Sequence, residues 1–130
     1  MRRISSVALI VRDCDEAIEF FAVKLGFEVL ENRGIDGGER RVRLVPAGGD
    51  GPVLRLVEAD ADRLDRVGSQ AAEEIFLVLE TDDLRRDYRH FERRGVVFEG
   101  EPREERGGVG TGAVFRDLYG NRWGLFEPSS

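Results

Sequence analysis

The chain has 130 residues, and its 20 Lys and Arg against 26 Asp and Glu give a formal net charge of −6 near neutral pH. This length, with 41% hydrophobic and 35% charged residues, is typical of one globular domain that folds without disulfides or a structural metal. The acidic excess argues against a nucleic-acid partner, because phosphate binding needs a basic surface. No apolar run reaches the roughly 20 residues of a membrane span and no signal peptide is recognised, so we expect a cytoplasmic protein without a membrane partner.

The single cysteine and the single histidine limit the available chemistry. They exclude an internal disulfide, a Cys/His zinc site and an iron site with two histidines and one carboxylate. His90 falls on the polar side of a predicted helix, away from the partners that a Ser-His-Asp arrangement needs. Cys14 has no second cysteine or histidine to support redox or nucleophilic work. We therefore expect no catalytic residue at either position.

The first half of the chain predicts the order βαβββ. Its first strand is short and apolar, and the polar cluster at 12–15 provides capping residues for the helix that follows. Apolar residues then recur at helical spacing as far as Leu25, and Gly26 is predicted to end the helix in a left-handed conformation. The predicted strands of this half are 7–11, 27–30, 41–45 and 53–57.

The second half repeats this plan about 70 residues later. A capping cluster at 81–83 precedes a helix with an apolar stripe, and Gly95 ends that helix. The Gly-rich stretch 107–112 is interpreted as a loop over a cavity, because a strand rather than a helix follows it. The predicted strands are 75–79, 96–98, 113–115 and 123–126. The fold class is therefore α+β, a single domain made of module 1–57, linker 58–74 and module 75–130.

Three sequence segments together resemble the vicinal oxygen chelate superfamily, which includes glyoxalase I, bleomycin resistance proteins and extradiol dioxygenases. They are the strand and cap at 7–13, the helix end Leu-Gly-Phe at 25–27 and the turn Asp-Leu-Tyr-Gly-Asn-Arg-Trp at 117–123. The resemblance implies that the two βαβββ modules form a cup-shaped mixed sheet with the helices on its outer face. It also implies a homodimer with ligand sites at or near the subunit interface.

Enzymes of this superfamily bind a divalent metal through side chains on the first and last strands of each module. Counting from the helix caps and from Gly120 places these ligand positions at Ser6, Arg55, Phe76 and Gly124. A hydroxyl, a guanidinium, a phenyl ring and a hydrogen do not make a metal site. We therefore expect no metal and no other cofactor.

Strand alternation assigns side chains to the cavity, which is predicted to be mostly apolar with few polar groups. Arg55 could pair with a ligand carboxylate or stack on an aromatic ligand, or it could form a structural ion pair with Glu80. Phe76 could stack on a ligand or belong to the core or a dimer interface, whereas Trp123 is predicted to lie in the core. The candidate ligand-binding residues are Ser6, Arg55, Phe76, Glu80, Gly124 and Phe126.

These features favour a metal-free protein that binds and sequesters a small molecule, an antibiotic or a metabolite, as bleomycin resistance proteins do. The ligand is expected to be aromatic or peptide-like. The alternative is a glyoxalase-like lyase or isomerase, or a dioxygenase, with an unrecognised metal site. A structural or regulatory module with a filled cavity is the third hypothesis.

Overall fold

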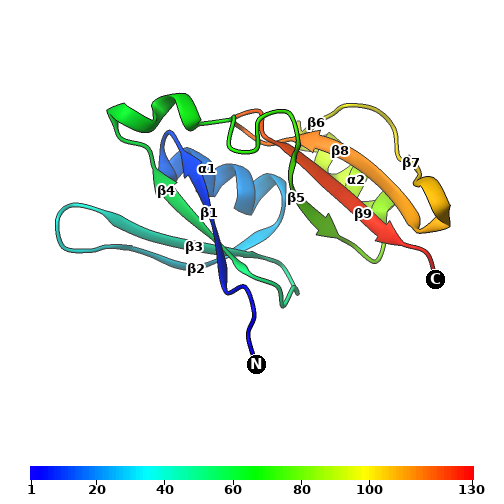
Figure 1. Ribbon diagram of the computed structural model, residues 1–130, viewed down its shortest axis with the longest axis horizontal. Coiled ribbons are helices and arrows are strands. Elements are labelled where there is room, and N and C mark those ends of the chain that lie inside the picture. The colour runs from blue at the N-terminus through cyan, green and yellow to red at the C-terminus, as the bar shows by residue number, and fades with distance from the viewer. The chain divides into compact units, whose positions relative to one another are not determined.

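The computed structural model describes residues 1–130, which divide into two compact units, Met1–Gly68 and Ser69–Ser130 (Figure 1). We call these units module 1 and module 2. Each contains one α-helix and a mixed β-sheet. Module 1 has the order βαβββ, and module 2 has the same order with one additional two-residue strand, so the predicted α+β class and the internal repeat are confirmed. No helix is long and apolar enough to cross a membrane.

Module 1 is built on a four-stranded sheet with the strand order β1-β4-β3-β2. β1 runs parallel to β4, and the other neighbours are antiparallel. The predicted helix continues beyond α1 as a π-helical turn, Phe20–Lys24, in which Leu25 donates its backbone N–H to the carbonyl of Phe20. The elements are β1 (Ser6–Val11), α1 (Cys14–Glu19), β2 (Phe27–Gly34), β3 (Arg40–Pro46), β4 (Val53–Glu58) and a 3-10 helix (Ala61–Arg66).

Module 2 repeats this arrangement with the strand order β5-β9-β8-β6, and β7 also pairs with β8. The elements are β5 (Ile75–Glu80), α2 (Leu84–Arg93), β6 (Val97–Phe98), β7 (Arg103–Glu104), a 3-10 turn (Arg106–Gly108), β8 (Gly110–Arg116) and β9 (Arg122–Pro128).

The predicted loop at 107–112 is wrong for its second half, because β8 already begins at Gly110. The backbone there pairs Gly110 with Pro128 and Gly112 with Phe126 of β9. The glycines at this position have no side chains, so the sequence shows no alternation of apolar and polar residues from which this part of the strand could be predicted. A Cβ at Gly110 would lie 2.2 Å from the carbonyl oxygen of Glu127, so glycine is required by the close approach of β9.

One face of each sheet packs against the helix of its own module, as the alternation predicted. In module 1 this face is formed by buried side chains from β1, β3 and β4, and α1 with its π-helical extension contributes Ala17, Phe20 and Phe21. In module 2, Trp123 and Phe115 stack with ring centroids 5.9 Å apart, and Phe91 of α2 lies 5.7 Å from Phe115. The strand residues of the module 1 core are Leu9, Val11, Val42, Leu44, Leu54 and Leu56.

A buried polar network holds the turn between β8 and β9. Asp117 is 5% exposed, and its carboxylate accepts hydrogen bonds from the Trp123 indole at 3.0 Å and from the Asn121 side-chain amide at 3.0 Å. It also accepts the backbone N–H of Asn121. The Asp-x-x-x-Asn turn that carried part of the family resemblance therefore has a structural role, and Trp123 lies in the core as predicted.

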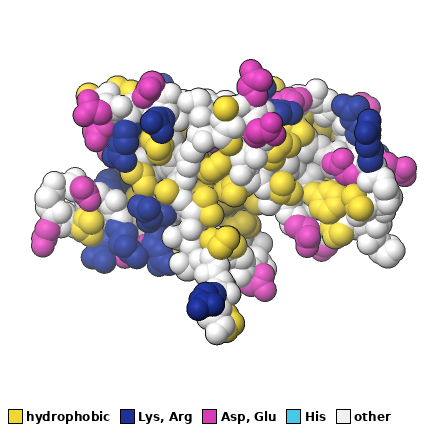
Figure 2. All heavy atoms as spheres, viewed as in Figure 1, with side chains coloured by type: hydrophobic (Ala, Val, Ile, Leu, Met, Phe, Trp, Pro, Cys, Tyr) yellow, Lys and Arg dark blue, Asp and Glu magenta, His cyan; other side chains and the backbone are white.

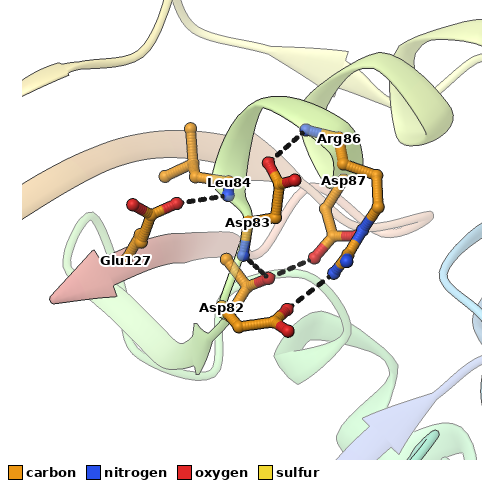
Figure 3. A network of polar contacts seen from close by, with 7 residues as sticks. Asp82, Asp83, Leu84, Arg86, Asp87 and Glu127 are labelled. Atoms are coloured by element: carbon orange, nitrogen blue, oxygen red, sulfur yellow. Dashed lines mark hydrogen bonds and ion pairs between the residues drawn. The ribbon is translucent and has the colours of Figure 1, made fainter.

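The beginnings of the two helices repeat the same chemistry. Asp13 and Asp83 are the N-caps. The Asp13 side chain accepts two backbone N–H groups of the first helical turn, and the Asp83 side chain accepts one. A glutamate at the end of the last strand of each module adds a second cap, because Glu58 accepts the N–H of Cys14 and Glu127 accepts that of Leu84. Figure 3 shows this arrangement at α2, where Arg86 also bridges Asp82 and Asp87.

Candidate functional site

We call the side of each sheet that faces away from its helix the open face. On module 1, β1 and β4 present small and apolar side chains there, with one exception at the centre of β4. Arg55 lies on this face, exposed, beside Ala8 of β1 in the parallel ladder. Ser6 is exposed on the same face at the start of β1, beside Val53. The sequence-predicted residues Ser6 and Arg55 therefore share one face.

Arginines dominate the other half of this face. Arg41 and Arg43 alternate along β3 with the buried Val42 and Leu44, and Arg33 of β2 lies directly opposite Arg41. Arg43 in turn lies directly opposite Arg55. We call Arg33, Arg41, Arg43 and Arg55 the arginine cluster. Figure 2 shows Lys and Arg side chains gathered over the β2–β3 part of module 1.

A single carboxylate within the cluster serves three of these guanidinium groups. Glu31 forms ion pairs with Arg33 at 2.6 Å, with Arg41 at 2.7 Å and with Arg43 at 3.6 Å. The hydrogen bonds from Arg33 and Arg41 lower the pKa of Glu31 below its ordinary value. The Arg55 side chain makes no hydrogen bond or ion pair within module 1, so no neighbouring carboxylate of this module neutralises its charge.

Arg55 and Arg41 border a hollow of 280 Å³ between β4, the β2–β3 hairpin and the 3-10 helix of module 1. Its floor includes the buried thiol of Cys14, whose pKa is raised by burial and by the nearby Glu58 carboxylate. A raised pKa keeps this thiol protonated, which agrees with the expectation of an inert cysteine. The charged lining residues are Glu39, Arg40, Arg41, Arg55, Glu58 and Arg63.

The open face of module 2 carries Arg116 and Arg122, which alternate with the buried Phe115 and Trp123, and beside them an apolar part that is shaped by glycines. A Cβ at Gly124 would lie 3.2 Å from Cγ2 of Val78 and 3.7 Å from Cγ2 of Ile75. The Phe126 ring lies over Gly110, with its Cζ 2.8 Å from where a Cβ would be. Glu80, at the end of β5, is exposed beside Phe126 in the ladder. Glu80, Gly124 and Phe126 are therefore brought together on one face.

Phe76 does not lie on this open face, so the prediction that its side chain points into the cavity is wrong. The β5–β9 ladder is irregular between Ile75 and Leu77, and this shift turns the side chain that follows Ile75. The Phe76 ring packs edge-on against the buried Trp123, with centroids 5.8 Å apart, and Ile75 lies beside Gly124 instead. Strict alternation fails across such an irregularity, because the extra residue reverses the direction of the side chains.

The residues at the superfamily's metal positions do not fit a divalent ion. Ser6 offers one hydroxyl, Arg55 carries a positive charge, Phe76 is turned to the core and Gly124 has no side chain. No three His, Cys, Asp or Glu side chains in residues 1–130 form a group that could hold a metal. We therefore derive no metal-dependent step at these positions.

Sequence reasoning missed Arg41, Arg43 and Glu31 as part of the candidate site. The alternation Arg-Val-Arg-Leu-Val at 41–45 already indicated that two arginines share one face of a strand. What the sequence did not contain was the register that sets Arg43 opposite Arg55, because it depends on how the β3–β4 hairpin closes.

Two mixed βαβββ modules, each with one open sheet face, define the architectural class. The model of the Glyoxalase/Bleomycin resistance protein/Dioxygenase superfamily matches residues 3–125, and the chain belongs to this family. A protein of Shewanella frigidimarina (strain NCIMB 400), described only as uncharacterized, is 40% identical over 126 residues, which are 95% of this chain and 92% of that protein.

Two solved structures extend the comparison. UcmS2 is 31% identical with a TM-score of 0.82, and the match covers 97% of this chain and 98% of that one. TnmS3, an antibiotic binding protein from Streptomyces sp. CB03234, is 29% identical with a TM-score of 0.79, and the match covers 99% and 98% of the two chains.

Proposed function

We propose that this protein binds and sequesters a small aromatic or peptide-like molecule, an antibiotic or a metabolite, without transforming it. The observation that carries the proposal is the composition of the four strand positions where the superfamily's enzymes hold a metal. Here they present a hydroxyl, a guanidinium, a core phenyl ring and a bare glycine, beside apolar open-face side chains suited to burying a ligand. The likeness to the antibiotic binding protein TnmS3 supports the same role.

We place ligand binding on the open faces, and we propose that Ser6 and Arg55 on module 1 and Glu80, Gly124 and Phe126 on module 2 are the contact residues. Phe126 supplies an aromatic ring, and Arg55 supplies the unpaired charge. We further propose that the protein works as a homodimer in the cytoplasm. Light scattering on a sizing column tests the dimer, since the expected mass is twice the 14.6 kDa of one chain.

A panel of aromatic and peptide-like antibiotics, screened by thermal unfolding, tests the function. A true ligand at about 100 times its dissociation constant stabilises the native state by about 2.7 kcal/mol. Mass spectrometry of the mixture after prolonged incubation should return the ligand unchanged and in stoichiometric complex. Phe126→Ala should weaken the complex, whereas Leu118→Ala, an exposed turn residue, should not.

Elemental analysis of the purified protein completes the test. We expect no stoichiometric Zn, Ni, Mn or Fe, because Arg55 repels a cation and the other three positions offer at most one weak ligand. Conversion of the ligand to a product, together with about one metal per chain that chelation removes, would replace sequestration with the enzyme alternative.

A further inference from the structure

We infer that the arginine cluster and the adjoining hollow of module 1 bind an oxyanion, so that the sequestered molecule carries a carboxylate, phosphate or sulfate group. This inference rests on the proposed ligand-binding function, because it names the chemistry of the ligand at the same open face. The supporting observations are the register of the arginines, the shortage of carboxylates and the position of the hollow.

The register sets like charges directly opposite each other twice on one face. Arg33 pairs with Arg41 across β2 and β3, and Arg43 pairs with Arg55 across β3 and β4. Directly opposed side chains have Cβ atoms only about 5 Å apart, and like charges in that arrangement destabilise a sheet. Glu31 already binds both members of the first pair, so the second pair, Arg43 and Arg55, is the one expected to gain from a bound anion.

The carboxylates of module 1 do not neutralise all four arginines of the cluster. Glu31 serves Arg33, Arg41 and Arg43, of which Arg43 has only a 3.6 Å contact, and Arg55 has none. Of the four arginines that line the hollow, Arg40 is paired with Asp15, Arg41 with Glu31 and Arg63 with Asp60, so Arg55 is the one left without a carboxylate. The lining Glu58 is already used to accept the N–H of Cys14. Guanidinium groups recognise planar oxyanions with paired hydrogen bonds, so an unpaired Arg55 is suited to a carboxylate or phosphate.

Module 2 contains a matched case in which an arginine pair is neutralised. Arg116 lies directly opposite Arg122, and Glu99 binds both, at 3.0 Å and 2.8 Å. The remaining donors of the pair reach backbone carbonyls, those of Gly120 and Glu73. An opposed arginine pair can therefore be satisfied within its own sheet. Arg43 and Arg55 are not, which is why the anion is assigned to module 1.

Isothermal titration with 2-naphthoate and its neutral isostere 2-naphthamide tests the inference. We expect naphthoate to bind about tenfold more tightly, as one charge-assisted hydrogen-bonded pair predicts, and to weaken with added NaCl. Arg55→Gln should abolish this preference, because it weakens naphthoate binding more than naphthamide binding. The matched control Arg116→Gln, in the neutralised pair, should keep the full preference. Equal binding of the two compounds by the parent, or a preference that survives Arg55→Gln, would overturn the inference but leave the proposed function standing.

Inorganic phosphate, followed through the arginine Nε–Hε signals in NMR, decides the case in which neither naphthyl compound binds. A saturable shift of the Arg55 signal that Arg116 does not share would uphold the anion site and reject the aromatic ligand class. No shift at Arg55 would reject the anion site as well.

Discussion

The two modules share the residues that cap their helices, but they differ in the side chains on their open sheet faces. Both begin their helix on an aspartate, and both add a glutamate from the end of the last strand as a second cap. On the open faces, the position occupied by Arg55 in β4 is occupied by Gly124 in β9, three residues before Glu58 and Glu127 respectively. The repeated residues therefore have structural roles, and the positions that differ are the ones for which we propose ligand binding.

Both open faces carry opposed arginines, but they differ in how these are neutralised. Glu99 binds both Arg116 and Arg122 in module 2, whereas Glu31 in module 1 leaves Arg55 without a partner. Module 2 also carries Ile75, Val78 and Phe126 packed around glycines. The unpaired guanidinium of module 1 can orient a ligand, and the apolar part of the module 2 face can bury one.

The largest expected effects on the free energy of unfolding come from substitutions on the helix-facing sides of the sheets, and substitutions on the open faces should have much smaller effects. Trp123→Ala and Phe21→Ala should each lower the free energy of unfolding by about 3–5 kcal/mol, because both side chains are at most 1% exposed. Val78→Ala, on the open face and 59% exposed, should cost less than about 1 kcal/mol. Urea denaturation measures all three. An open-face cost as large as the core cost would contradict the assignment of the faces.

Two glycines of β8 test whether close packing around the backbone requires glycine on the open face of module 2. Gly110→Ala should destabilise by about 1–3 kcal/mol, because the new methyl would meet the Glu127 carbonyl and the backbone φ is +153°. Gly112→Ala should be close to neutral, since its Cβ would meet only the carboxyl end of the exposed Glu105 side chain. Thermal unfolding of the two variants would refute this explanation if their order were reversed.

Substitution of the two capping aspartates tests whether the helices of both modules are stabilised in the same way. Asp13→Ala and Asp83→Ala should each cost about 0.5–2 kcal/mol. Asp13 should cost more, because it accepts two backbone N–H groups, at 2.8 and 3.1 Å, whereas Asp83 accepts one at 3.1 Å. Asp36→Ala, in the β2–β3 loop, serves as the control and should leave the urea midpoint unchanged. Equal costs at all three positions would remove the capping explanation.

The smallest effect concerns pH. Arg33 and Arg41 lower the pKa of Glu31, and Arg122 and Arg116 lower that of Glu99. A carboxyl group whose pKa is lowered by folding stabilises the native state above its unfolded pKa, and this stabilisation is lost as the pH falls through the folded pKa. Parent stability should therefore decline below about pH 4.5, and less steeply in Glu31→Gln and Glu99→Gln. Urea midpoints measured against pH, with Glu19→Gln as the control, would contradict this if all slopes were equal.

Much of the fold could be predicted because local signals repeat along the chain. The capping aspartates, Gly26 and Gly95 delimit both helices, and the apolar alternation of β1, β4 and β9 assigns their faces correctly. The direction of Phe76 could not be predicted, because the irregularity in the β5–β9 ladder is a property of strand pairing.

The arginine cluster was hidden for a related reason. Arg43 and Arg55 are separated along the chain, and only the register of two strands sets them opposite each other. Local sequence patterns were therefore enough to predict the helices and strands, whereas predicting which side chains meet on the open faces required knowledge of the strand pairing.

The central claim is that the open faces hold the ligand and that the arginines of module 1 orient it. A ¹⁵N-resolved NMR titration with 2-naphthoate tests this most directly. We predict saturable shifts centred on Arg41, Arg43 and Arg55, with α1 and α2 unaffected. Shifts confined to the helices, or none at the three arginines, would contradict it.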